Sequence, residues 1–114
     1  MYKIYLSEYF LKQLEPLLKK YRHLDDDVEC LLNNFNQEMS VALGANLYKL
    51  RLKSSDIKKG SQKAFRLIIF LYQSKQGLIP VNVYFKGDKE SIDKEEIKLH
   101  LRKVLEELKN KKDF

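Results

Sequence analysis

An almost uninterrupted apolar run over 64–72 constrains this chain more than any other feature of its sequence. It reads Ala-Phe-Arg-Leu-Ile-Ile-Phe-Leu-Tyr, and Arg66 is its one charged residue. Alternate side chains of a strand point to opposite faces, so a strand over these residues has two largely apolar faces. That pattern is typical of a central strand, and it predicts a sheet with neighbours on both sides of 64–72.

Two further β-prone runs, over 47–53 and 78–86, are the expected neighbours. The intervening residues 73–77 are few enough to join 64–72 and 78–86 as a hairpin. Proline cannot donate a hydrogen bond to a sheet, so Pro80 predicts an outer position for the amino end of its strand.

The rest of the chain is expected to be mostly helical. The expected elements are a strand over 2–6, helices over 8–21 and 26–39, a loop over 40–46, and a helix that begins after Asp93. Ser7 is typical of a helix N-cap, whereas Pro16 predicts a kink or a restart within the first helix. Asp93 and Glu96 have the spacing of a capping box.

The order of these elements is strand, two helices, three strands and helix. It predicts an α+β fold, in which a small antiparallel-type sheet has helices packed on one face. The 114 residues are expected to form a single domain over 1–114.

Positive charge is concentrated in one segment of the chain. Lysine and arginine total 22 against 16 acidic residues, which gives a net charge of +6. The window 46–66 alone has seven basic residues and one acidic residue, so it accounts for +6 and the rest of the chain is balanced. Charge confined to one segment indicates a polyanion or an acidic partner. The seven are Lys49, Arg51, Lys53, Lys58, Lys59, Lys63 and Arg66.

Strand alternation would bring part of this charge together. On 47–53 the three basic side chains share one face and the apolar ones share the other. If helices cover the more apolar face of the sheet, an open cationic face remains. Its expected members are Lys49, Arg51, Lys53, Arg66, Tyr84 and Lys86. Lysine and arginine bind phosphate and tyrosine stacks on unpaired bases, which favours single-stranded RNA as the ligand.

Purely structural interpretations stand beside this one. A Lys-x-Arg-x-Lys pattern on a strand is more often a solvated or edge-protecting face than a binding site. Arg66 is costly to bury in an apolar strand, so it either pairs with a carboxylate or faces a cleft.

Other reactive residue types predict little chemistry. Cys30 is the only cysteine, so it cannot pair within the chain, and we expect it to fill the core. His23 and His100 fit helix-end or boundary positions better than an acid/base pair. We expect no cofactor and no metal. Without a signal peptide or an apolar run of about 20 residues, we expect a cytoplasmic protein that does not use a membrane.

An ordered set of segments resembles the RelE/ParE superfamily of toxins from bacterial toxin–antitoxin pairs. The set is Leu-Tyr-Lys-Leu-Arg-Leu-Lys over 47–53, a basic loop with Gly60, Ala-Phe-Arg-Leu-Ile-Ile-Phe over 64–70, and Val-Tyr-Phe-Lys-Gly-Asp-Lys-Glu-Ser-Ile over 83–92. It is most similar to the RelE and HigB-like branches. The resemblance implies a RelE-like fold and a metal-independent endoribonuclease that cleaves messenger RNA, usually on the ribosome, and is inhibited by a cognate antitoxin protein.

The resemblance also implies the site residues. By position, the expected catalytic residues are Lys49, Arg51, Arg66 and Lys86, and the expected substrate-binding residues are Lys53, Lys63, Tyr84 and Lys89. In this chemistry a ribose 2′-hydroxyl attacks the neighbouring phosphorus. A lysine among other cations can take the proton, while arginines hold the phosphate.

One departure from the family concerns the leaving group. RelE proteins have a catalytic tyrosine in their last element, whereas this sequence has no tyrosine after Tyr84. Tyr84 or a lysine would take its place. The ParE branch shares the fold but poisons DNA gyrase. The alternative is therefore a gyrase poison, or an inactive relic that acts as a protein-interaction module.

Overall fold

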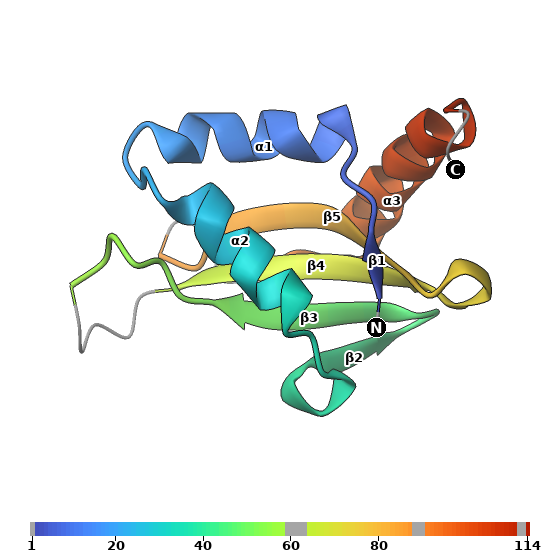
Figure 1. The fold of residues 1–114 in the computed structure, drawn as a ribbon, viewed down its shortest axis with the longest axis horizontal. Helices are drawn as coiled ribbons and strands as arrows, with labels where there is room; N and C mark the ends of the chain where they lie inside the picture. The colour runs from blue at the N-terminus through green and yellow to red at the C-terminus, as the bar shows by residue number, and fades with distance from the viewer. Residues whose placement is uncertain (1, 59–63, 88–90, 112–113) are drawn as a thin grey trace.

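The computed structural model describes residues 2–58, 64–87, 91–111 and 114 (Figure 1). These residues form one mixed five-stranded sheet with the strand order β1-β5-β4-β3-β2, together with three α-helices. The elements are β1 (Lys3–Ile4), α1 (Glu8–Leu18), α2 (Leu24–Asn33), β2 (Val41–Gly44), β3 (Leu47–Leu52), β4 (Phe65–Tyr72), β5 (Gly77–Phe85) and α3 (Lys94–Lys109). The α+β class predicted from the sequence is therefore confirmed, and the predicted order of elements holds except for one additional strand, β2.

Strand β4 is the centre of the sheet, as the apolar run predicts. It pairs with β3 on one side and with β5 on the other, both antiparallel. Leu67 and Ile68, which point to opposite faces, are both fully buried. Burial on both faces requires cover on both faces, and the helices provide it.

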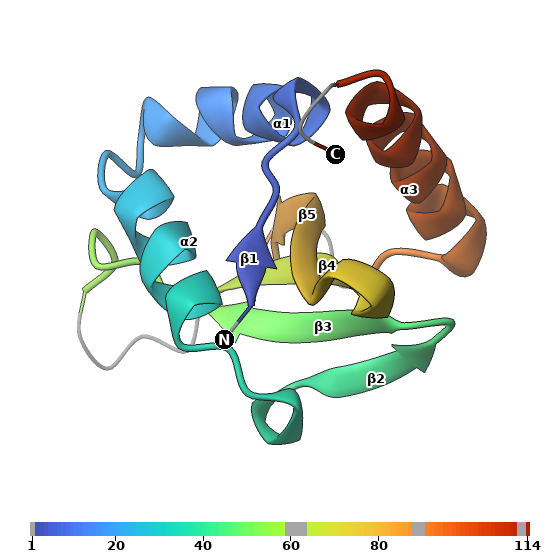
Figure 2. The same ribbon diagram turned by 45° about the vertical axis from the view of Figure 1, so that its right-hand side comes forward.

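The helices lie on both faces of the sheet, whereas the sequence analysis places them on one. Helices α1 and α2 pack through Phe10 and Val28 against the face that carries Leu67. Helix α3 packs through Ile97 against the face that carries Ile68. Figure 2 shows α2 and α3 on opposite sides of the sheet, while the amino end of α1 lies close to α3. A central strand that is apolar on both sides explains the difference, because cover on one face alone would leave the other in water.

Strand β2 occupies most of the segment that the sequence analysis assigns to a loop over 40–46. It pairs antiparallel with β3, and Val41 lies opposite Lys49. The turn uses Ala45 and Asn46 with φ angles of 54° and 64°. Positive φ at both central residues is what a two-residue type I′ hairpin requires. The segment is therefore a short edge strand and a tight turn.

The proline of β5 does not mark an outer position, contrary to the sequence expectation. The amino end of β5 pairs with β4 on one side and with β1 on the other, and Pro80 is buried. The amides of Lys3 and Tyr5 donate to the carbonyls of Gln76 and Leu78 on the outer edge of β5. Pro80 lies two residues after Leu78, so the position of its missing amide faces the same edge. Strand β1 ends at Ile4, which pairs with Leu78. Pro80 therefore lies beyond the end of β1, where β5 needs no amide for strand pairing.

Beyond β1, the side chain of Gln13 from α1 bonds to the outer edge of β5. Its Nε2 donates to the carbonyl of Val81 at 3.0 Å. Its Oε1 accepts from the amide of Val83 at 3.3 Å and from Asn82 Nδ2 at 2.6 Å. One carboxamide thus satisfies edge groups that a longer β1 would have paired.

The helix boundaries differ from the expected ones, but their caps follow the sequence. Pro16 lies inside α1, which ends soon after at Leu18, and α2 ends at Asn33 instead of residue 39. Asp93 accepts a hydrogen bond from the amide of Glu96 at 2.8 Å, which confirms the cap of α3. None of the helices formed by the described residues is long and apolar enough to cross a membrane.

Cys30 is exposed on α2, so the expectation that it fills the core is wrong. The buried residues of α2 are Leu24, Val28 and Leu32, spaced four apart along one face. A residue two positions after Val28 points away from that face.

A carboxylate of α3 caps the amino end of α1. The two oxygens of Glu107 accept hydrogen bonds from the amides of Glu8 at 2.7 Å and Tyr9 at 2.9 Å. Partial burial favours protonation of this carboxyl, but the two amides and the ammonium of Lys111 outweigh it, so the pKa of Glu107 lies below its usual 4.5. This contact joins the second element of the chain to the last.

Glu107→Gln should destabilise the fold by about 1 kcal/mol at neutral pH, the usual loss for a helix cap. Because the pKa of Glu107 is lower in the folded state, its contribution is present above pH 4.5 and is lost as the pH falls through the folded pKa. The difference from wild type, measured by urea unfolding, should therefore shrink at low pH. Glu106→Gln on the exposed face is the control, and an equal effect of both variants would contradict the cap.

Candidate nucleic-acid interface

Four of the basic residues predicted from the sequence line one pocket. Its volume is about 300 Å³, and we call it the cationic pocket. The described residues that line it are Lys49, Arg51, Arg66, Lys86, Met39 and Val41. They come from β3, β4, the residue after β5, and β2 with the turn that precedes it. The structure thus brings together the four residues expected to be catalytic.

Strand register accounts for this convergence. Arg51 lies directly opposite Arg66, and Lys49 lies opposite Val41 on the other side of β3. Lys86 follows β5, and its amide donates to the carbonyl of Ala64 at 3.1 Å, which holds it beside the start of β4. Residues opposite one another in a sheet have neighbouring side chains on the same face. Pairing alone therefore sets the position of the cations.

The electrostatics of the cationic pocket favour an anion. Like charges directly opposite one another destabilise a sheet, and here Arg51 faces Arg66. No carboxylate is among the described residues that line the pocket. The Nη1 of Arg66 donates to the carbonyl of Phe65 at 3.2 Å. Of the two alternatives open for Arg66, the structure shows the cleft position, half-buried beside the other cations.

Tyr84 lies near the cationic pocket but beneath its surface. It is opposite Arg66 in the sheet register. Its side chain is only 9% exposed and packs with Ile68 and Ile97 under α3. A base has little tyrosine surface to stack on there, so the structure does not place Tyr84 where the sequence analysis expects it to bind RNA.

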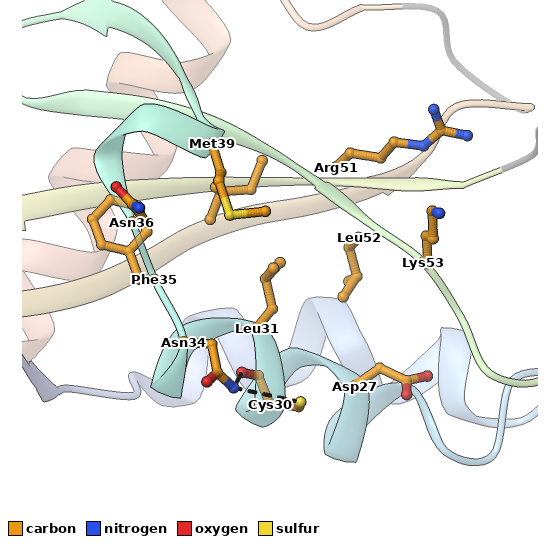
Figure 3. A pocket seen from close by; sticks show the side chains of 11 residues that line it. Asp27, Cys30, Leu31, Asn34, Phe35, Asn36, Met39, Arg51, Leu52 and Lys53 are labelled. Carbon is orange, nitrogen blue, oxygen red and sulfur yellow. Dashed lines mark hydrogen bonds between the residues drawn. The ribbon is translucent and has the colours of Figure 1, made fainter.

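The remaining predicted binding residues lie elsewhere. Lys53 lines a neighbouring groove of about 480 Å³ between α2 and β3, which shares Met39 and Arg51 with the cationic pocket. Figure 3 shows Leu31 and Leu52 pointing into this groove, while Arg51 extends away from α2. Lys63 and Lys89 fall outside the described residues.

Met39 and Val41 are pocket residues that the sequence analysis misses. Their exposed fractions are 76% and 56%, which makes them the most exposed large apolar side chains of the described chain. They belong to the segment interpreted as a loop. The signal that could have found it is the apolar Val-Ala-Leu run over 41–43, followed by residues that accept positive φ at a tight turn.

Neither histidine lies in the cationic pocket. His23 Nδ1 contacts Asp56 Oδ1 at 2.8 Å, and its amide donates to Asp56 Oδ2 at 2.8 Å. His100 Nδ1 contacts the hydroxyl of Tyr9 at 2.6 Å between α3 and α1. The two histidines thus have separate structural partners, in line with the sequence expectation. Among the described residues, no three histidine, cysteine, aspartate or glutamate side chains gather as a metal site would require.

Comparison with known proteins gives a likeness of fold. No protein-family model and no curated protein match the chain. A solved structure does: the toxin RelE of E. coli, a double arginine-to-alanine mutant in the free state. It is 17% identical, and the alignment covers 90% of this chain and 95% of that one with a TM-score of 0.54. The chain has the RelE fold. At 17% identity the likeness to RelE is one of architecture, so a role for the cationic pocket has to be argued from its own geometry.

The pair of His23 and Asp56 gives a test of the segment that follows β3. Hydrogen bonding and charge from Asp56 raise the pKa of His23 above 6.5, and the same contacts lower the pKa of Asp56 below 3.8. The pair should stabilise the fold above pH 3.8, and this contribution should fade as the pH rises through the folded pKa of His23. NMR titration of the ring should give a pKa above 6.5, and Asp56→Asn should lower it. A titration unchanged by that substitution would contradict the contact.

Proposed function

We propose that this protein is a RelE-type toxin that cleaves messenger RNA and thereby stops translation. The observation that carries the proposal is the convergence of Lys49, Arg51, Arg66 and Lys86 on one open pocket. Cations on neighbouring strands bind the phosphates of RNA and release its counterions. A protein that only needed solubility would gain nothing from placing Arg51 opposite Arg66.

The proposed reaction transfers a phosphoryl group within the RNA strand. The ribose 2′-oxygen attacks the adjacent phosphorus, and Lys49 in its neutral form takes the hydroxyl proton. Arg51 and Arg66 stabilise the charge that builds on the phosphate oxygens. The bond from phosphorus to the 5′-oxygen breaks, and that oxygen takes a proton from Lys86. The products are a 2′,3′-cyclic phosphate and a 5′-hydroxyl.

The pocket chemistry favours a metal-independent mechanism. Magnesium is held mainly by carboxylate oxygens, whereas the described lining residues supply only cationic and apolar side chains. The positive charge that a metal would bring is supplied by the guanidinium and ammonium groups themselves. Lys86 also takes the role that a tyrosine of the last element has in RelE relatives.

We further propose an antitoxin as the partner that keeps the nuclease inactive, and the ribosome as the place where messenger RNA is cut. An acidic antitoxin segment over the cationic pocket would compete with RNA for the same charges. The exposed Met39 and Val41 at its rim would give such a segment apolar surface to bury.

Arg66→Ala should slow RNA cleavage by about 100-fold or more, the usual effect of removing one group that stabilises transition-state charge. In cells, this variant should no longer inhibit growth or translation. The measurement is growth after induced expression, with primer extension on abundant messages to find new 5′ ends. Arg102→Ala on the exposed face of α3 is the matched control and should remain toxic.

Three results would contradict the nuclease. Arg66→Ala could remain fully toxic while folded, as judged by circular dichroism. Purified protein with ribosomes and messenger RNA could leave the message intact. Induced cells could show DNA breaks with intact messages, and that pattern would favour the gyrase-poison alternative.

A further inference from the structure

A second pocket lies on the same sheet face as the cationic pocket. It has a volume of about 240 Å³ and lies between the β2–β3 turn and the first turns of α3. We call it the hairpin pocket. Its described lining residues are Leu43, Gly44, Ala45, Leu47, Lys94, Ile97 and Lys98. It is smaller than the roughly 300 Å³ at which pockets for drug-sized ligands begin, so it suits a single flat ring.

Strand alternation makes the two pockets neighbours along β2 and β3. Val41 and Lys49 line the cationic pocket, and Leu43 and Leu47 line the hairpin pocket. Each step is two residues along a strand, which is about 6.6 Å. That is close to the spacing of adjacent phosphates in an extended RNA strand. A strand whose phosphate lies among Lys49 and the arginines would therefore meet the hairpin pocket one nucleotide away.

The chemistry of the hairpin pocket matches the two halves of a nucleotide. Its floor is apolar, because Leu47 and Ile97 lie buried beneath it. The more exposed Leu43 and Ala45 supply the apolar surface that a base can cover. Its rim has two lysines one helical turn apart on α3, which suits a phosphate. Lys98 contacts Glu95 at 3.7 Å, but both side chains are well exposed, and such a surface pair is weak.

We propose that the hairpin pocket binds a second nucleotide of the RNA strand whose reacting phosphate lies in the cationic pocket. The base rests on the more exposed Leu43 and Ala45, above the buried Leu47, and the ammonium groups of Lys94 and Lys98 bind the adjoining phosphate. This subsite rests on the proposed function, because it needs an RNA strand in the cationic pocket. It also gives the RNA path a direction, from the carboxyl end of β3 toward the amino end of α3.

The test measures the binding of uncleavable RNA. The probes are fluorescein-labelled 2′-O-methyl oligonucleotides of mixed sequence, one of six nucleotides and one of two, which lack the nucleophilic hydroxyl. Wild type should bind the hexanucleotide more tightly than the dinucleotide in fluorescence anisotropy. Lys94→Gln/Lys98→Gln should raise the Kd for the hexanucleotide by roughly tenfold. It should also reduce the salt dependence by about 0.7 per lost phosphate contact.

The matched control is Lys103→Gln/Lys109→Gln, which removes the same charge from exposed positions of the same helix. It should bind the hexanucleotide within about twofold of wild type, a shift expected from net charge alone. Methyl NMR signals of Leu43 and Ala45 should shift when wild type binds the hexanucleotide.

The outcomes separate the subsite from the nuclease. If both double variants bind equally, or if wild type does not distinguish the two lengths, the subsite is wrong, even where Arg66-dependent cleavage is observed. If Lys94→Gln/Lys98→Gln loses affinity, Lys103→Gln/Lys109→Gln does not, and no message is cut, the result supports the subsite and contradicts the nuclease.

Discussion

The side-by-side pairing of β3, β4 and β5 is the constraint on which the rest of this structure depends. Strand β4 is buried on both faces, and a slip of its register by one residue would turn Arg66 toward the face that carries Leu67. That register fixes Arg66 between Arg51 and Tyr84. The cationic pocket is therefore a product of the core.

Helix α3 decides how much of the second face remains open. It covers Ile68 and Tyr84 through Ile97, and the uncovered remainder of the face is where the cations lie. The sequence alone does not indicate a helix on this face, because the alternation of side chains shows which face is more apolar and not that both are covered. The open surface is consequently smaller than expected, and it excludes the ring of Tyr84.

Much of the fold could be predicted from local patterns in the sequence. Each of these features is encoded by residues close together in the sequence: the apolar run over 64–72, its two neighbouring strands and the cap at Asp93. Strand β2 is hard to predict because Gly44 and Asn46 are typical of loops. Only pairing with β3 shows that Gly44 ends an edge strand and that Asn46 belongs to a hairpin turn. The prediction from Pro80 is wrong because β1, the strand beside it, ends at Ile4. The length of β1 cannot be read from the residues around Pro80.

For the candidate site, the alternation of side chains along the strands predicts which cations share a face. It does not predict which of them line the same pocket. Lys49, Arg51, Arg66 and Lys86 meet because they lie within paired segments. Lys53 lies one residue past the end of β3 and lines the groove beside α2 instead. Met39 and Val41 have no charge or motif to mark them, so only the position of the edge strand reveals them.

The cap that Glu107 provides has a consequence for how the chain acquires its structure. The bond to the amide of Glu8 closes a loop of 99 positions, and contacts over such separations form late in folding. During synthesis Ser7 caps the amide of Phe10, but the amides of Glu8 and Tyr9 lack the carboxylate of Glu107 until α3 has emerged and docked. A nascent chain that stalls before α3 should therefore have a less stable first turn of α1.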